Sequence, residues 1–255
     1  MLLMPHKLRR GAAASFTTLA FLAHPAAAQV VAPVVPVVTA PRFLVKPAPA
    51  GLVVATSGAL YLTAEVFKSD LPYATCAPCD ASKLPGIDRW ILGPVRPGIS
   101  TVSDATLMLT VAGSAALLYA DPGTRAEHAE DLAVWTEAMS VSSAALVWTK
   151  VLFHRPRPIL YTSAAVANAT PDNGLSFPSG HASLVFAAAA AYAEIEHRRG
   201  RHAGRRGALA GLIGTAATTA LLRVVARRHF PTDVMAGAVL GSATGWLVPA
   251  IYPMQ

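Results

Sequence analysis

The sequence predicts an all-α protein, a multi-helix transmembrane bundle of about six helices. Apolar residues make up 53% of the 255 residues and charged residues only 14%, whereas average soluble domains carry roughly 25% charged residues. Several apolar runs are close to the ~20 residues that span a bilayer, and neither a strand-type alternation nor an internal repeat is visible. Helices that face lipid explain this composition without a very large, Ala-rich interior.

The first 28 residues look like a secretory signal peptide. A basic stretch precedes an apolar one, and the three alanines at 26–28 offer a small-residue cleavage site. The same segment would also serve as an uncleaved N-terminal membrane anchor, and both interpretations stay open. Residues 29–50 contain five prolines and almost no polar residues, which predicts an extended linker. The folded helical domain is therefore expected to cover residues 51–255.

Six helical segments follow, each rich in the small residues that let membrane helices pack closely. The segment nearest the N-terminus is the weakest, because it is short and carries Glu65. Ser103-Asp104 and Thr232-Asp233 are suited to cap the helices that they begin. Residues 68–102 are polar enough to form an extramembrane loop. The expected helices are 51–67, 103–120, 129–152, 181–198, 207–227 and 232–251.

The two cysteines lie in this loop as Cys76-Ala-Pro-Cys79. One such pair is too small for a tetrahedral zinc site, and no histidine lies nearby in the sequence. The strand-to-helix context of a thioredoxin-like motif is also missing. We therefore predict a local disulfide formed in an oxidising compartment, and we expect no metal and no cofactor.

The net charge of +7 is concentrated in five arginines between residues 198 and 206. Such a patch is compatible with nucleic-acid binding, but its place between two apolar segments favours a cytoplasmic loop that obeys the positive-inside rule. We exclude nucleic acid as a partner. The flanking helices then bring residues 150–180 and 228–233 to the external face. A spanning helix at 51–67 after an exported residue 29 would invert this orientation, so we expect that helix to lie against the membrane surface or in the periplasm.

Three polar motifs stand at the ends of the predicted helices and define a candidate active site at one membrane face. Phosphoryl transfer requires positive charge around the phosphate oxygens, an in-line nucleophile and a proton donor for the leaving oxygen. Cations, imidazoles and a carboxylate in these motifs meet those requirements. The motifs are Lys150 with Arg157-Pro158, then Pro178-Ser179-Gly180-His181, then Arg223 with His229 and Asp233.

Each motif supplies a different part of this chemistry. Ser179 and Gly180 precede a helix, whose first backbone N–H groups attract an anion. His229 and Asp233 are four residues apart, so the carboxylate is placed to hold one ring nitrogen and leave the other free to attack phosphorus. His181 is then the general acid for the departing alkoxide.

With these spacings, residues from about 129 to 245 resemble the type 2 phosphatidic acid phosphatase and vanadium haloperoxidase superfamily. The resemblance implies a metal-independent phosphatase with a phosphohistidine intermediate. It makes His229 the nucleophile, Asp233 its orienting carboxylate and His181 the leaving-group acid. This chain departs from the family pattern at Leu222, where a serine is usual. The implied phosphate-binding residues are Lys150, Arg157, Ser179, Gly180 and Arg223.

The expected protein is thus a membrane-bound phosphatase for a lipid phosphomonoester or diphosphate, in a bacterial inner membrane with its site facing the periplasm. The alternatives are a soluble periplasmic acid phosphatase, a vanadate-dependent haloperoxidase, and a non-enzymatic transporter or lipid-binding protein. Neither the lipid nor the oligomeric state is predicted, and Glu137 and Asp172 receive no role. Four further basic residues are expected to be solvated charges at helix ends: His154, Arg155, Arg227 and Arg228.

Overall fold

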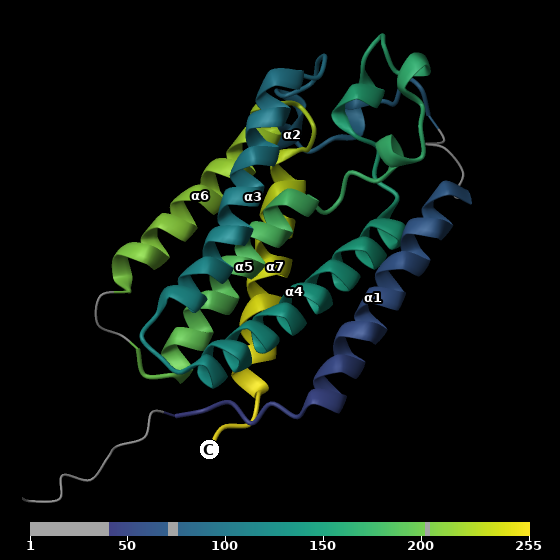
Figure 1. Cartoon of the computed structure of the whole chain (residues 1–255). Helices are drawn as coiled ribbons and strands as arrows, with labels where there is room; N and C mark the ends of the chain where they lie inside the picture. The colour runs from purple at the N-terminus through teal and green to yellow at the C-terminus, as the bar shows by residue number, and fades with distance from the viewer. Residues whose placement is uncertain (1–40, 71–75, 202–204) are drawn as a thin grey trace, which may run out of the picture. The chain divides into compact units, whose positions relative to one another are not determined.

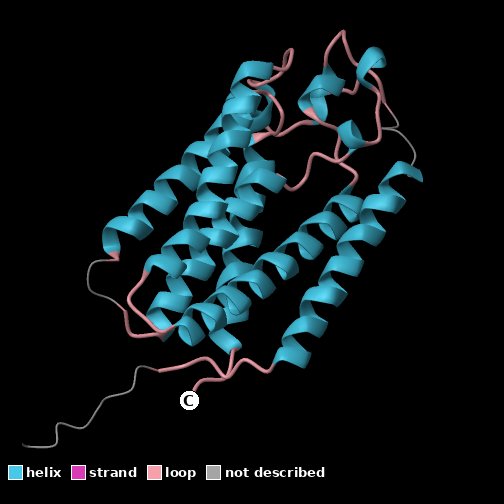
Figure 2. Ribbon diagram, viewed as in Figure 1, coloured by secondary structure: helices cyan, strands magenta, loops and turns pink. Residues whose placement is uncertain are grey.

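The computed structural model describes residues 41–70, 76–201 and 205–255, all within one compact unit. The predicted signal peptide, residues 1–28, and most of the predicted linker lie outside the described residues. The fold class is confirmed, because the described part of the chain is helical and its only β-type pairing is an isolated bridge between Phe43 and Met254 (Figures 1 and 2).

Six long helices and one short one make up the bundle (Figure 1). Four of the long helices are apolar and long enough to cross a membrane, namely α1, α3, α6 and α7. The helices are α1 (Pro47–Asp70), α2 (Gly86–Arg89), α3 (Pro97–Ala120), α4 (Arg125–Phe153), α5 (Gly180–Arg198), α6 (Arg206–Val225) and α7 (Pro231–Ile251).

Every predicted helix begins earlier than the sequence suggested, and α1, α3 and α4 do so by about one turn or more. The structure starts α1 at Pro47, inside the segment predicted as an extended linker, and α3 at Pro97 rather than at Ser103. Both prolines occupy the first helical positions, where a missing N–H group has no intrahelical partner to lose. The predicted capping by Ser103 is therefore wrong. Its hydroxyl donates to the Ser100 carbonyl, 2.7 Å away, from within the helix.

Helix α1 packs within the bundle, and the expectation that it lies against the membrane surface or in the periplasm stays a prediction. It packs along α4 (Figure 1), where the Trp148 indole N–H donates to the Leu60 carbonyl at 3.1 Å. Its start is tied to the end of α7 by a short backbone ladder. In this ladder Leu44 N donates to Pro253 O at 2.9 Å, and Gln255 N donates to Arg42 O at 3.0 Å.

The bundle has two distinct ends, which we call the motif end and the arginine end. The motif end holds the C-termini of α4 and α6 and the N-termini of α3, α5 and α7. The arginine end holds the opposite termini and the arginine-rich segment after α5 (Figure 1). All three sequence motifs thus lie at the motif end, as the alternating helix directions require.

Three of the arginines that follow α5 are paired with acidic side chains. Arg199 bonds to Asp131 at 2.7 Å and to Glu130 at 2.9 Å, and both Arg201 and Arg205 contact Asp121. The side chains of Asp121 and Asp131 are fully buried. These arginines therefore neutralise acidic groups inside the arginine end, because a buried carboxylate without a partner is costly.

Glycines on α7 allow α5 and α7 to pack with their backbones in close contact. A Cβ atom added at Gly237, Gly241 or Gly245 would lie 2.5, 1.9 or 2.3 Å from the carbonyl oxygens of Ser179, Ser183 and Ala187 respectively. Small residues four apart are the usual means of such approach in membrane helices. This glycine stripe sets the distance between the N-termini of α5 and α7, which carry two of the three motifs.

We expect Gly241→Ala to destabilise the protein, because its methyl group would meet the Ser183 carbonyl in a tightly packed contact. Overpacking of this kind costs about 1–3 kcal/mol. Gly214→Ala on α6 is the matched control, since a Cβ there meets no atom within 4 Å. Thermal half-lives of the two variants in detergent measure the difference. Equal half-lives would show that α5 and α7 are not held at this distance by the glycines.

Candidate active site

The nucleophile predicted from the sequence, His229, lies in the turn between α6 and α7, and only 2% of its surface is exposed. Its Nδ1 atom is 2.8 Å from the carbonyl oxygen of Ser176 and 3.7 Å from Oδ2 of Asp233. A carbonyl oxygen only accepts hydrogen bonds, so Nδ1 carries the hydrogen and Nε2 is the unprotonated nitrogen. The Ser176 carbonyl is thus the nearer of the two groups that set the tautomer.

The Asp233 carboxylate is fully buried and hydrogen-bonded through both oxygens. Oδ2 accepts from the Ser176 hydroxyl at 2.5 Å and from the Phe230 backbone N–H at 2.9 Å. Oδ1 accepts from the Arg155 guanidinium at 2.5 Å. Asp233 therefore faces His229 in one orientation while it also binds the first turn of α7.

Burial lowers the pKa of His229 well below its usual 6.5. The hydrogen bond with Asp233 opposes this shift, while the positive charges of Arg157 and Lys150 add to it. Desolvation disfavours the charged imidazole, and nearby cations do the same. The ring is therefore neutral at physiological pH, which is the state that a nitrogen nucleophile requires.

The three predicted cations lie at the motif end on different elements, and the charges of Lys150 and Arg157 act on the His229 imidazole. Lys150, in the last turn of α4, donates to the Leu175 carbonyl at 2.8 Å. Arg157, just after α4, pairs with the exposed Asp172 at 3.0 Å, and burial lowers its pKa. Arg223, near the end of α6, donates to the Ser103 hydroxyl at 2.9 Å.

Five donors at the motif end are buried without a hydrogen-bond partner among the described residues. They are the hydroxyls of Ser179 and Ser183 and the Nε atoms of Arg157, Arg223 and Arg228. Buried polar groups in proteins are nearly always satisfied. Such a set of cationic donors and hydroxyls has the chemistry of an anion site with several acceptor oxygens.

The N-terminus of α5 contributes to the same region. Ser179 and Gly180 begin this helix, whose first N–H groups have no intrahelical acceptor. A Cβ at Gly180 would lie 3.9 Å from Cε of Lys150, which shows how closely α5 approaches that side chain. The Ser179 N–H itself donates to the Asp233 carbonyl at 2.9 Å and joins the starts of α5 and α7.

His181 is the second imidazole of the site and lies on the first turn of α5. Its Nε2 atom is 2.6 Å from Oδ1 of Asp104 on α3, and the same oxygen is 3.3 Å from the Arg223 guanidinium. A carboxylate accepts, so Nε2 of His181 carries a hydrogen. Asp104 was not anticipated as a site residue, because the sequence suggested only a capping role for it at the start of a helix far from the three motifs.

Arg155 is not a solvated charge at a helix end, contrary to the sequence expectation. Its Nη1 atom donates to Asp233 at 2.5 Å and to the Thr232 hydroxyl at 2.6 Å, and its Nη2 atom donates to Asp88 at 2.7 Å. The same expectation fails for Arg228, whose Nε is buried. The buried Asp88, on the short helix α2, had no signal in the sequence.

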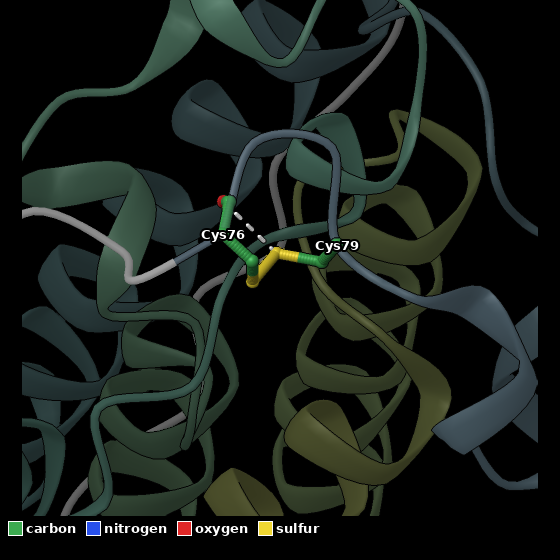
Figure 3. Close-up of a disulfide and its surroundings, with 2 residues drawn as sticks. All are labelled: Cys76 and Cys79. Atoms are coloured by element: carbon green, nitrogen blue, oxygen red, sulfur yellow. Dashed lines mark hydrogen bonds between the residues drawn. A yellow bond between two sulfur atoms is a disulfide. The ribbon is translucent and has the colours of Figure 1, made fainter.

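The loop between α1 and α3 covers this end of the bundle. Cys76 and Cys79 form a disulfide (Figure 3), and Cys79 N donates to Leu160 O at 2.8 Å. Cys79 packs with Ile159 and Leu160 in a small apolar cluster. The disulfide therefore braces the segment that follows Arg157.

Glu137, which the sequence left without a role, lies away from the motif residues. It is 4% exposed and accepts a hydrogen bond from the Tyr252 hydroxyl at 2.9 Å. This bond gives the carboxyl group a partner inside an apolar helix and joins α4 to the end of α7.

A buried neutral histidine beside a carboxylate, with cationic side chains at the same end of an apolar helical bundle, has the chemistry of a phosphate-binding site. Residues 132–255 match the family model described as PAP2 superfamily, and this region of the chain is similar to that family of phosphatase-type hydrolases. The match begins in α4, so Asp88 and Asp104 lie outside it. No curated protein and no solved structure matches the chain.

Proposed function

We propose that the protein is a membrane-bound, metal-independent phosphatase that hydrolyses a lipid phosphomonoester or diphosphate through a phosphohistidine intermediate. One observation carries the proposal most directly. His229 is held with Nε2 unprotonated at the same end of the bundle as the buried donors of Ser179, Arg157 and Arg223 that have no partner among the described residues. A nucleophile and a set of phosphate-binding donors therefore occur at the same end of the bundle.

The residues divide the reaction into two balanced steps. In the first, His229 Nε2 forms a bond to phosphorus as the P–O ester bond breaks, and the leaving oxygen takes a proton from the imidazolium form of His181, which becomes neutral. In the second, water attacks the phosphohistidine, His181 takes the proton of that water, and the P–N bond breaks. Lys150, Arg157 and Arg223 neutralise the phosphoryl oxygens throughout. Fixed cations thus supply the positive charge that a metal ion supplies in other phosphatases, and they would repel one.

The position of the site at the end of a bundle with four potential spans supports a lipid substrate. A phosphate group would reach a site at the end of such a bundle most readily when an apolar chain anchors it in the bilayer. The Cys76–Cys79 disulfide supports a periplasmic motif end, because disulfides persist in oxidising compartments. A bacterial inner membrane with the arginine end in the cytoplasm satisfies both conditions.

Phosphate release from a panel of substrates by full-length protein in detergent tests this function. The panel contains phosphatidic acid, phosphatidylglycerol phosphate, an isoprenyl diphosphate and the soluble ester p-nitrophenyl phosphate, each with and without EDTA. We expect the highest kcat/KM for a lipid and no loss with EDTA. A preference for the soluble ester, or strong inhibition by EDTA, would overturn the proposal. Bromide oxidation with added vanadate and peroxide would instead favour the haloperoxidase alternative.

We expect the nucleophile to stay neutral under mildly acidic conditions, and the dependence of kcat/KM on pH tests this. Because the pKa of His229 is lowered below 6.5, the acid limb of kcat/KM assigned to this residue should lie below pH 6.5. The contribution of neutral His229 to the free energy of unfolding also depends on pH. This contribution is complete above pH 6.5 and is lost as the pH falls through the lowered pKa. Two substrates with different phosphate pKa values separate the enzyme limb from the substrate limb. A limb above pH 6.5 that is common to both would contradict this prediction.

A further inference from the structure

We propose that Arg155 is a positioning residue for the nucleophile, and that Asp88 controls how much of the Arg155 charge acts on Asp233. The inference rests on the proposed function but concerns residues outside the three motifs. Arg155 holds both groups that contact His229 Nδ1. Its guanidinium binds the Asp233 carboxylate at 2.5 Å, and its backbone carbonyl accepts from the Ser176 N–H at 2.7 Å.

The geometry requires the planar fork of an arginine. One nitrogen of the guanidinium reaches Asp233 and Thr232 on α7, and the other reaches Asp88 on α2. The guanidinium also lies 4.4 Å from the centre of the Phe230 ring, which restricts its orientation. A lysine carries the same charge but not two divergent donors in one plane. Thr232 completes the contact, donating to Asp88 from its hydroxyl at 2.7 Å.

The charges explain why two carboxylates share one arginine. The side chains of Asp88 and Asp233 are both fully buried, so this triad carries a net negative charge in a poorly solvated place. When Nε2 of His229 bonds to phosphorus and the P–O bond breaks, the hydrogen stays on Nδ1 and the ring becomes cationic. Asp233 stabilises that cation only if Arg155 does not fully neutralise it. By binding the other side of the guanidinium, Asp88 keeps part of the Asp233 charge available to His229.

Steady-state kinetics of full-length Arg155→Lys, Arg155→Gln and Asp88→Asn, with the best substrate of the panel, test the inference. For Arg155→Lys we expect kcat to fall about 10- to 100-fold with KM within about twofold, because a misplaced nucleophile slows chemistry more than binding. Arg89→Gln is the matched control. It removes an arginine of α2 whose side chain donates hydrogen bonds only to the carbonyls of Leu84 and Ser82 in the described structure. We expect it to retain wild-type kinetics.

The pH profiles provide a readout that a purely structural role would not produce. Removing the positive charge in Arg155→Gln should move the acid limb of kcat/KM to higher pH. Removing the competing negative charge in Asp88→Asn should move it to lower pH and reduce kcat. The charged and titratable groups around His229 in these measurements are Asp233 on α7, Lys150 on α4, Arg155 and Arg157 after α4, and Asp88 and Tyr161 behind Arg155.

Arg155→Gln leaves two buried carboxylates without their partner, so melting temperatures are measured for every variant. If Arg155→Gln does not fold, the kcat of Arg155→Lys and the pH profile of Asp88→Asn test the inference without it. Unchanged kcat in Arg155→Lys, or limbs that move in the same direction in both charge variants, would overturn the inference. An inactive His229→Ala protein alongside fully active Arg155 and Asp88 variants would remove this inference and leave the proposed function standing.

Discussion

Replacing His229 with alanine is expected to reduce phosphate release by at least about 10⁴-fold, the scale seen when the attacking group of a covalent mechanism is removed. The fold should persist, because alanine leaves the backbone of the α6–α7 turn intact and removes no buried charge. Phosphate release and size-exclusion profiles in detergent measure the two effects separately.

A matched control is His128→Ala at the arginine end, where the ring packs against Tyr119. We expect wild-type turnover from this variant. Labelled phosphate from the substrate, trapped on the wild-type protein in an alkaline quench, should be lost only in His229→Ala. Substantial turnover by His229→Ala, or a phosphoenzyme that it still forms, would contradict the assignment of the nucleophile.

Replacing His181 with asparagine should separate substrates by their leaving groups. For a lipid phosphate, whose alkoxide needs a proton to depart, we expect kcat/KM to fall about 10²- to 10⁴-fold. For p-nitrophenyl phosphate the phenolate leaves without a proton, so we expect a loss of less than about tenfold in the same step. The ratio of the two values is the measurement, because it cancels changes in protein folding and in active fraction.

An equal loss for both substrates would contradict a role for His181 as leaving-group acid. It would point instead to phosphate binding, which both substrates need equally. Ser103→Ala serves as the comparison variant, since it removes one hydrogen bond to Arg223 and no proton donor near the leaving group. We expect its effect to be the same for the two substrates.

Residues that are close in sequence were predictable, and those joined only by the tertiary fold were not. His229 and Asp233 lie one helical turn apart, and Ser179 to His181 begin a helix, so their spacing already suggests a shared site. Asp88 and Arg155 are 67 residues apart, and Asp104 and Arg223 are 119 apart. Periodicity and motif spacing carry no information on such pairs.

The bundle itself followed from apolar composition, but the helix starts and the ion pairs did not. Proline was taken as a helix breaker at Pro47, whereas in a first turn it has no hydrogen bond to remove. In the sequence, the arginines between 198 and 206 form a basic cluster without visible partners. The acidic partners of Arg199, Arg201 and Arg205 come from α4, from α5 and from the residue that follows α3. Charge partners of this kind appear only once the helices are packed.

The backbone ladder between residues 42–44 and 253–255 turns the helical part of the chain into a closed ring. Bringing the two ends of so long a segment together costs conformational entropy, and this cost grows with the length of the segment. The contacts that build the motif end join α3 to α7, which are closer neighbours along the chain. We therefore expect the ring to close last during folding, after the catalytic groups have assembled. A fusion partner at the C-terminus would then slow the final docking of α1 while leaving the chemistry at the other end unchanged.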